Sequence, residues 1–148
     1  YETEGYVLLP ELREAGIDVA FMASDGCFLY EFIDGAGPAA EGAYVSAITP
    51  DPRVVADAAW WREYQEIEAR NPGTYSIAGY SAMTVLAEGV KRARSLDAAA
   101  IGQALKQGEL TTMVGKITYD ERGDLEDQQI YIFRVQDGEF VQWTDSAG

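Results

Sequence analysis

Three side chains in this sequence have the types and positions to bind a small charged molecule: Tyr1, Asp25 and Tyr75. Asp25 directly follows the apolar run DVAFMA, and open α/β sheets bind ligands beyond the carboxyl ends of their strands. Tyr1 takes the equivalent position if a strand precedes it. Tyr75 stands at the start of a predicted helix, where free backbone N–H groups favour an anion. One carboxylate, two phenols and a helix end suit a small zwitterion, with Asp25 for its ammonium and the helix end for its carboxylate. The residues alone also allow a purely structural interpretation. In that case Asp25 is an exposed turn residue, and the two tyrosines are half-buried, packed rings.

The composition excludes several other kinds of chemistry. The 148 residues include no histidine and a single cysteine, Cys27, which rules out imidazole ligands, histidine-based catalysis and an internal disulfide. For Cys27, a small buried or cleft-lining thiol is favoured over a nucleophile. The net charge of −14 argues against nucleic acid and against anionic membrane surfaces as partners. We therefore predict no catalytic residue, no metal site and no cofactor.

The sequence contains no targeting or membrane-spanning signal. No apolar run approaches the roughly 18 residues of a membrane span, and no signal peptide is recognisable. The chain opens at Tyr1 without an initiating methionine. We therefore expect it to be a piece of a longer protein.

The helix that must position Tyr75 is predicted from residue 71 to residue 95. Asn71, Pro72 and Gly73 interrupt whatever precedes it, and Thr74 is the expected N-cap. Residues at helical spacing predict its buried face: Tyr80, Met83, Leu86 or Ala87, and Val90.

The elements that must position Asp25 alternate between helix and strand. A helix is predicted over residues 4–15, with a kink at Pro10, followed by a buried parallel strand over 18–23. A short helix over 28–33 and a strand over 43–48 come next. This alternation predicts a doubly wound α/β layer.

A change of pattern at Thr49 to Pro52, TPDP, predicts the start of a second structural unit. Helices are expected over 53–70, 71–95 and 97–107, with Asp97 as the N-cap of the last. A strand follows over 110–119, with a bend at Gly115, and a turn over 120–125. Two further strands, 129–135 and 139–143, flank the hairpin signal Asp137-Gly138.

Several stretches, taken in order, resemble a known family. They are YETEGYVLLPELREAGID, FMASDG, GPAAEGAYV, YSIAGYSAMTVLAEGV, GKITYDERGDL and IYIFRVQDGEFV, which together span almost the whole chain. They are similar to the C-terminal part of class I periplasmic substrate-binding proteins of the branched-chain amino-acid (Leu/Ile/Val-type) ABC transporters.

The resemblance implies a ligand-binding role for three residues. Tyr1 matches the tyrosine that heads the first helix and contacts the amino-acid ligand. Asp25 matches the acid that binds the ligand ammonium, where familiar members carry glutamate. Tyr75 matches the tyrosine that lines the cleft from the opposite lobe.

The resemblance also implies the fold: α/β, class I periplasmic-binding-protein-like, with doubly wound sheets in two lobes, of which this chain is the C-terminal part of each. Residues 1–48 plus 128–148 would form the C-terminal lobe, and residues 49–127 part of the N-terminal lobe. The N-terminal portion of the full protein, with side chains that bind the ligand carboxylate, would be missing.

The implied function is the solute-binding component of an ABC importer, a non-enzyme that captures an amino acid, or a similar small molecule, in an interlobe cleft. Its partners would be that ligand and a membrane permease, and its location periplasmic or extracellular. Two alternatives remain: a ligand-sensing domain of a regulator or receptor with this fold, and a binder of a non-amino-acid ligand such as an aromatic acid. A hydrolase is disfavoured by the missing histidine and the absence of a Gly-x-Ser-x-Gly motif.

Overall fold

The computed structural model describes residues 1–144, which divide into two compact units. The first unit comprises Tyr1–Asp51 and the chain from Ile130 onward, and the second comprises Pro52–Gln129. Residues 145–148, which the sequence assigns to the C-terminal lobe, lie outside the described residues.

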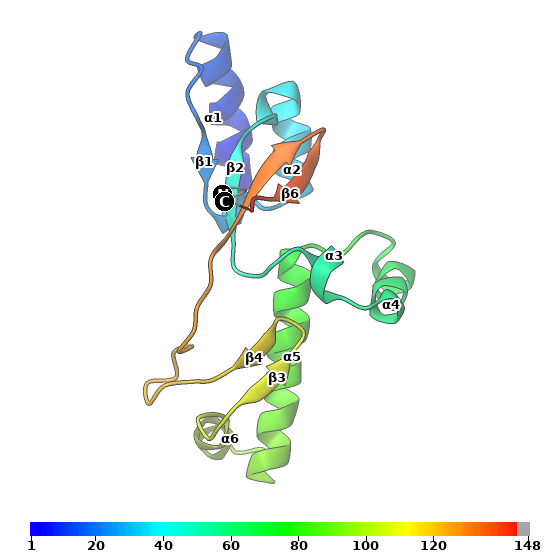
Figure 1. Ribbon diagram of the computed structural model, residues 1–148, viewed down its shortest axis with the longest axis vertical. Helices are drawn as coiled ribbons and strands as arrows, with labels where there is room; N and C mark the ends of the chain where they lie inside the picture. Colours follow the sequence, from blue (N-terminus) through cyan, green and yellow to red (C-terminus); the bar gives the residue numbers. More distant parts are fainter. Residues whose placement is uncertain (145–148) are drawn as a thin grey trace. The chain divides into compact units, whose positions relative to one another are not determined.

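The first unit is a four-stranded mixed sheet with helices packed against it (Figure 1). Strand order is β1-β2-β5-β6, with β1 and β2 parallel and the other two pairings antiparallel. Its elements are α1 (Glu2–Glu14), β1 (Met22–Ala23), the 3-10 helix η1 (Asp25–Cys27), α2 (Tyr30–Ala36), the 3-10 helix η2 (Gly37–Ala40), β2 (Tyr44–Ala47), β5 (Tyr131–Gln136) and β6 (Glu139–Gln142).

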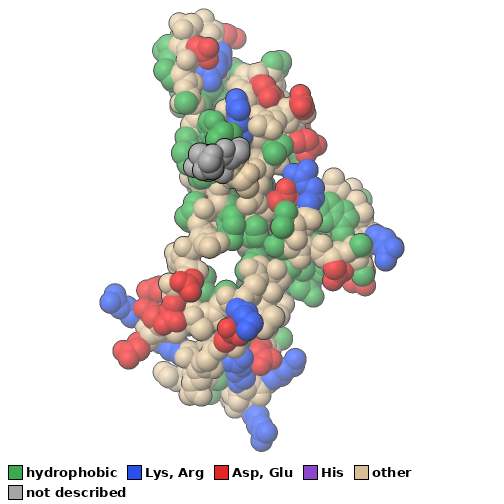
Figure 2. Space-filling view, in the orientation of Figure 1, with side chains coloured by type: hydrophobic (Ala, Val, Ile, Leu, Met, Phe, Trp, Pro, Cys, Tyr) green, Lys and Arg blue, Asp and Glu red, His purple; other side chains and the backbone are tan. Residues whose placement is uncertain are grey.

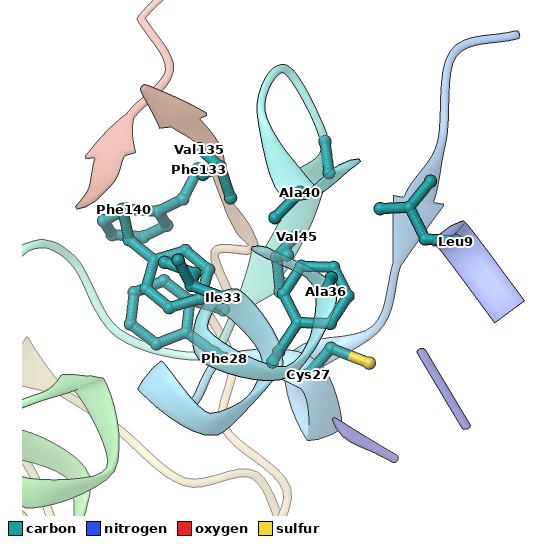
Figure 3. Close-up of a cluster of buried hydrophobic side chains, with 13 residues drawn as sticks. Leu9, Cys27, Phe28, Ile33, Ala36, Ala40, Val45, Phe133, Val135 and Phe140 are labelled. Carbon is teal, nitrogen blue, oxygen red and sulfur yellow. The ribbon is translucent and has the colours of Figure 1, made fainter. Parts of the chain in front are cut away.

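Aromatic side chains dominate the core of this unit (Figure 3). Phe28 stacks on Phe140 with ring centroids 4.2 Å apart and meets Phe133 edge-on at 4.6 Å. Phe32 is fully buried. Val45 of β2 and Phe133 of β5 belong to the same cluster. The helices are held to the sheet because burying large rings removes much apolar surface from water.

The strand before Asp25 is shorter and more exposed than the sequence predicts. Its parallel pairing with β2 is confirmed, but only Met22 and Ala23 form a ladder, and the prediction of a buried strand over 18–23 is wrong. Met22 and Val19 are more than half exposed. Within the described residues β1 has a neighbouring strand, β2, on one side only.

Helix α1 confirms the helix predicted over residues 4–15, although it begins at Glu2. Gly5 and Leu9 are buried, whereas Val7 and Leu8 are about half exposed. A Cβ atom at Gly5 would lie 2.9 Å from the Cys27 sulfur and 3.1 Å from the Phe32 ring. Gly5 therefore faces inward, because the lack of a side chain there lets α2 and η1 pack closely against α1. Pro10 lies inside the helix, which continues to Glu14.

The second unit is mainly helical. Its elements are α3 (Pro52–Val55), α4 (Ala58–Glu68), α5 (Thr74–Ala93), α6 (Ala98–Leu105), β3 (Leu110–Thr112) and β4 (Gly115–Ile117). The single helix predicted over 53–70 is divided because Asp57 caps α4, accepting the backbone N–H groups of Ala59 and Trp60 at 2.8 and 2.9 Å. The predicted cap Asp97 is confirmed and accepts from Ala100 at 2.9 Å.

Helix α5 is present as predicted, but its cap and its buried face are not those expected. Gly73, not Thr74, is the N-cap. The buried positions include Ile77, Val85 and Gly89, while the predicted inward residues Tyr80, Met83 and Leu86 are about half exposed. Gly89 explains the change of face, because a Cβ there would lie 2.9 Å from Ile101 and Leu105 of α6.

Two hairpins complete the chain. The strand predicted over 110–119 is a hairpin, because the chain reverses at residues 113 and 114, directly before Gly115, which opens β4 at φ +112°. Asp137 and Gly138 both have positive φ, as the predicted tight turn between β5 and β6 requires. The turn predicted over 120–125 is confirmed by Asp120, whose carboxylate accepts the N–H groups of residues 122, 123 and 124.

Candidate ligand-binding site

Asp25 lies in the turn directly beyond the carboxyl end of β1. It opens η1 and is partly exposed. Because β1 and β2 are parallel, their carboxyl ends share one edge of the sheet, and buried Thr49 and Asp51 follow β2 there. The fold therefore places Asp25 at the edge where an open α/β sheet binds its ligands.

Tyr1 lies at the N-terminus of α1, against the same turn. Its backbone carbonyl accepts the thiol proton of Cys27 at 3.3 Å and the N–H of Gly5 at 3.1 Å. A Cβ atom at Gly26 would lie 2.7 Å from Cδ1 of the Tyr1 ring. Tyr1 is 85% exposed, so one edge of the ring rests on the turn and the remainder faces solvent. The structure thus brings Tyr1 next to the turn that holds Asp25.

Cys27 is a buried thiol, as predicted. It is only 4% exposed and lies at the edge of the aromatic core (Figure 3). Burial in apolar surroundings raises the pKa of this thiol above its ordinary value, because the thiolate would lose its hydration. The group therefore serves as a hydrogen-bond donor rather than as a nucleophile.

Tyr75 belongs to the second unit, where it is the second residue of α5 and is 41% exposed. Its neighbour Ser76 is fully engaged within the unit. The Ser76 hydroxyl accepts the N–H of Gly73 at 3.2 Å and donates to the Tyr64 hydroxyl at 2.8 Å. Tyr75 itself is partly exposed at this helix end.

Aromatic residues of α4 support this helix end, and sequence reasoning gave them no role. Trp60 stacks on Tyr64 with centroids 5.3 Å apart and meets Tyr80 edge-on at 5.5 Å. The four-residue spacing of Trp60 and Tyr64 is the signal that could have identified them, because it places both rings on one helix face. Through Tyr64 they fix Ser76, the residue after Tyr75.

Candidate metal sites and membrane spans are absent from the part of the chain that the structure describes. Among residues 1–144 no group of three or more acidic, cysteine or histidine side chains could hold a metal ion. None of the helices described is both long and apolar enough to cross a membrane. Figure 2 shows acidic and basic side chains interspersed over the visible face, with no continuous basic patch.

The comparisons with known proteins identify the family. Residues 4–139 match the family model described as periplasmic binding protein, and the chain belongs to that family. The Leu/Ile/Val-binding protein homolog 1 of Brucella suis is 31% identical over 122 residues, which is 82% of this chain and 33% of the relative. The chain thus spans about a third of the length of that curated relative.

Solved structures show the same fold. A leucine binding protein from Thermotoga maritima matches 97% of this chain and 42% of its own, with a TM-score of 0.85 and 24% identity. A solute binding protein of an ABC transporter from Rhodopseudomonas palustris, solved with 3,4-dihydroxybenzoic acid, matches 95% of this chain and 41% of its own. Its TM-score is 0.69 and its identity 20%. The α/β fold of a class I periplasmic binding protein, expected from the resemblance, is therefore confirmed.

Proposed function

We propose that this chain is part of the solute-binding component of an ABC importer, which captures an amino acid by closing two lobes around it. The observation that carries the proposal is the pairing of Tyr1 with the Asp25 turn at the carboxyl edge of β1, in a chain of this family. A carboxylate and a phenol drawn from adjoining segments, the Asp25 turn and the start of α1, suit an ammonium group that carries an apolar side chain.

In this proposal each compact unit is part of one lobe. Residues 1–48 plus 128–148 belong to the C-terminal lobe and supply Tyr1 and Asp25. Residues 49–127 belong to the N-terminal lobe and supply Tyr75. A preceding portion of the protein supplies the groups that bind the ligand carboxylate. The two compact units, with their junctions at Asp51–Pro52 and Gln129–Ile130, support this assignment.

A branched-chain amino acid is the ligand we favour, and the name of the Brucella suis relative supports it. Asp25 binds the ammonium, which loses its water when the lobes close. Aspartate is one methylene shorter than the glutamate of familiar members, so the ammonium must approach the η1 turn more closely.

The partners and the location follow from the same role. The protein delivers its ligand to a membrane permease from the periplasm or the extracellular side, and it catalyses no reaction. A ligand-sensing domain of a regulator is the alternative of another class, and the genes beside this one, or a fused signalling domain, would distinguish the two.

The test is calorimetry on the full-length protein with the twenty common amino acids and a set of aromatic acids. We expect leucine, isoleucine or valine to bind at micromolar concentration or tighter. A protein that bound none of these compounds would contradict the proposal.

An aromatic acid is the second candidate ligand, because a structure of this fold holds 3,4-dihydroxybenzoic acid. Such a ligand carries no ammonium and makes no use of a carboxylate partner. The same calorimetry separates the candidates, since an aromatic acid should bind equally well to the wild type and to Asp25→Asn.

A further inference from the structure

Gly26, the residue after Asp25, is in contact with the ring of Tyr1. A Cβ atom at Gly26 would lie 2.7 Å from Cδ1, 3.2 Å from Cε1 and 3.5 Å from Cα of Tyr1, and these are its three nearest neighbours. Gly26 is not among the residues with positive φ, so its backbone conformation is open to other amino acids. The space taken by the Tyr1 ring is therefore the reason for a glycine here.

Cys27, the next residue, holds the backbone of Tyr1. Its thiol donates to the Tyr1 carbonyl at 3.3 Å, and the same carbonyl accepts the N–H of Gly5 in the first turn of α1. Cys27 is buried against the core, so its sulfur has a fixed position. Consecutive residues of one turn thus contact both the main chain and the ring of Tyr1.

The turn that carries Asp25 therefore also influences where the Tyr1 ring lies. A tyrosine at the end of an α-helix can adopt several rotamers if nothing else contacts its ring. Contact with Gly26 favours those in which the ring lies against the turn that carries Asp25. A ligand held by Asp25 through its ammonium would then meet the Tyr1 ring with its side chain.

We propose that Gly26 and Cys27 are positioning residues that hold the Tyr1 ring beside Asp25, and that they thereby set which ligand side chains the site accepts. The inference rests on the proposed function for its ligand but not for its geometry. Neither residue needs to touch the ligand.

A double-mutant cycle on the full-length protein tests the inference, with calorimetric titration of leucine and valine. Gly26→Ala and Tyr1→Ala should each weaken leucine binding about three- to tenfold and change the ratio of the two dissociation constants. The double variant should bind no worse than Tyr1→Ala alone, because the added methyl group acts only through the ring. Additive losses would overturn the inference.

Gly35→Ala is the matched control. A Cβ atom at Gly35 would lie 2.5 Å from the ring of Tyr6, so this variant also forces a tyrosine of α1 aside, but not the one in the site. We expect it to lower stability without changing the leucine-to-valine ratio. An equal change in that ratio would show general disturbance of α1 and would overturn the inference.

Two further variants address the thiol and require no change at Gly26. Cys27→Ser keeps a hydrogen-bond donor and should retain the leucine-to-valine ratio, whereas Cys27→Ala should shift it toward that of Tyr1→Ala. Identical behaviour of the serine and alanine variants would overturn the role of Cys27.

A measurement without ligand separates this inference from the proposed function. The Tyr1 ring should shift the NMR resonances of the Gly26 α-protons through its ring current, and Tyr1→Ala should remove that shift. Unchanged Gly26 resonances would overturn the inference whatever the ligand. Failure of the wild type to bind any compound tested would instead count against the proposed function alone.

Discussion

Asp25 and Gly26 are consecutive residues of one turn, but they differ in their exposure to solvent. Asp25 follows a strand that is open to solvent on one side, and its carboxylate is partly exposed. Gly26 is buried beneath the Tyr1 ring. Substitutions at Asp25 should therefore act through charge, and substitutions at Gly26 through shape.

Asp25→Asn in the full-length protein should weaken amino-acid binding by roughly 30-fold to several thousand-fold. Loss of one partner of an enclosed charge pair costs about 2–5 kcal/mol, at about 1.4 kcal/mol for each factor of ten. Calorimetry with leucine measures the loss, and the matching carboxylic acid without the ammonium is the control ligand. An affinity for leucine within about threefold of wild type would show that Asp25 does not bind the ammonium.

Tyr75 should affect ligand shape more than ligand charge. In the full-length protein, Tyr75→Phe removes one hydrogen bond and should cost on the order of 1 kcal/mol of binding free energy. Tyr75→Ala also removes the ring and should cost more, with a shift of preference toward bulkier side chains. Titrations with valine, leucine and phenylalanine measure the shift, and equal losses for all three in both variants would contradict a shape-reading role.

Cys27 should react slowly with thiol reagents in the folded protein. Burial raises its pKa, so little thiolate is present at the ordinary thiol pKa. The pKa of Cys27 is higher in the folded protein than in the unfolded protein. The neutral thiol therefore contributes to stability below the ordinary thiol pKa, and this contribution is lost as the pH rises through the raised pKa of the folded protein. Iodoacetamide labelling with and without urea, from pH 7 to 10, measures the difference, and equal rates in both states would refute a buried thiol.

The helices and turns differ in how far the sequence alone determines them. Asp97 and the Asp137-Gly138 hairpin were predictable, because a cap and a two-residue turn depend on neighbouring residues only. The buried face of α5 was not, since the spacing of its apolar residues fits two faces and the packing of α6 on Gly89 decides between them. The edge position of β1 likewise depends on strand order, which no local pattern contains.

The candidate site was predictable only in part, for the same reason. Asp25 follows an apolar run, and its place beyond β1 could be predicted from that pattern. The contact of Tyr1 with Gly26 joins residues 25 positions apart, and the support of Ser76 by Tyr64 joins two helices. A ligand contact from Tyr75 stays a prediction.

Helix α4 should depend strongly on its cap. None of its residues is buried, so packing contributes less to it than to α5. Asp57→Ala removes the acceptor of two N–H groups and should lower the free energy of unfolding by about 1 kcal/mol. Urea denaturation followed by circular dichroism measures the change, and Asp57→Asn, which keeps a capping oxygen, is the control. An equal loss in both variants would show that the charge, not the cap, stabilises the helix.

The chain as a whole should bind its ligand poorly by itself. In the proposed function the groups that bind the ligand carboxylate lie in a preceding portion of the protein, and a carboxylate left partly unpaired loses affinity steeply. Calorimetry of the isolated 148 residues against the twenty common amino acids should show no submillimolar binding. A micromolar titration would contradict this expectation and would place the complete site within these residues.

The discontinuity of the first unit has a consequence for how the chain emerges from the ribosome. The central strand pair of its sheet joins Tyr44 to Arg134, so this pair cannot form until Arg134 is synthesised. The second unit is continuous from Pro52 to Gln129 and emerges before that point. Because domains generally fold as they emerge, the unit encoded in the middle of the chain can fold first, while residues 1–51 wait without their partner strands. During that interval the ring of Phe28 lacks its contacts with the rings of Phe133 and Phe140.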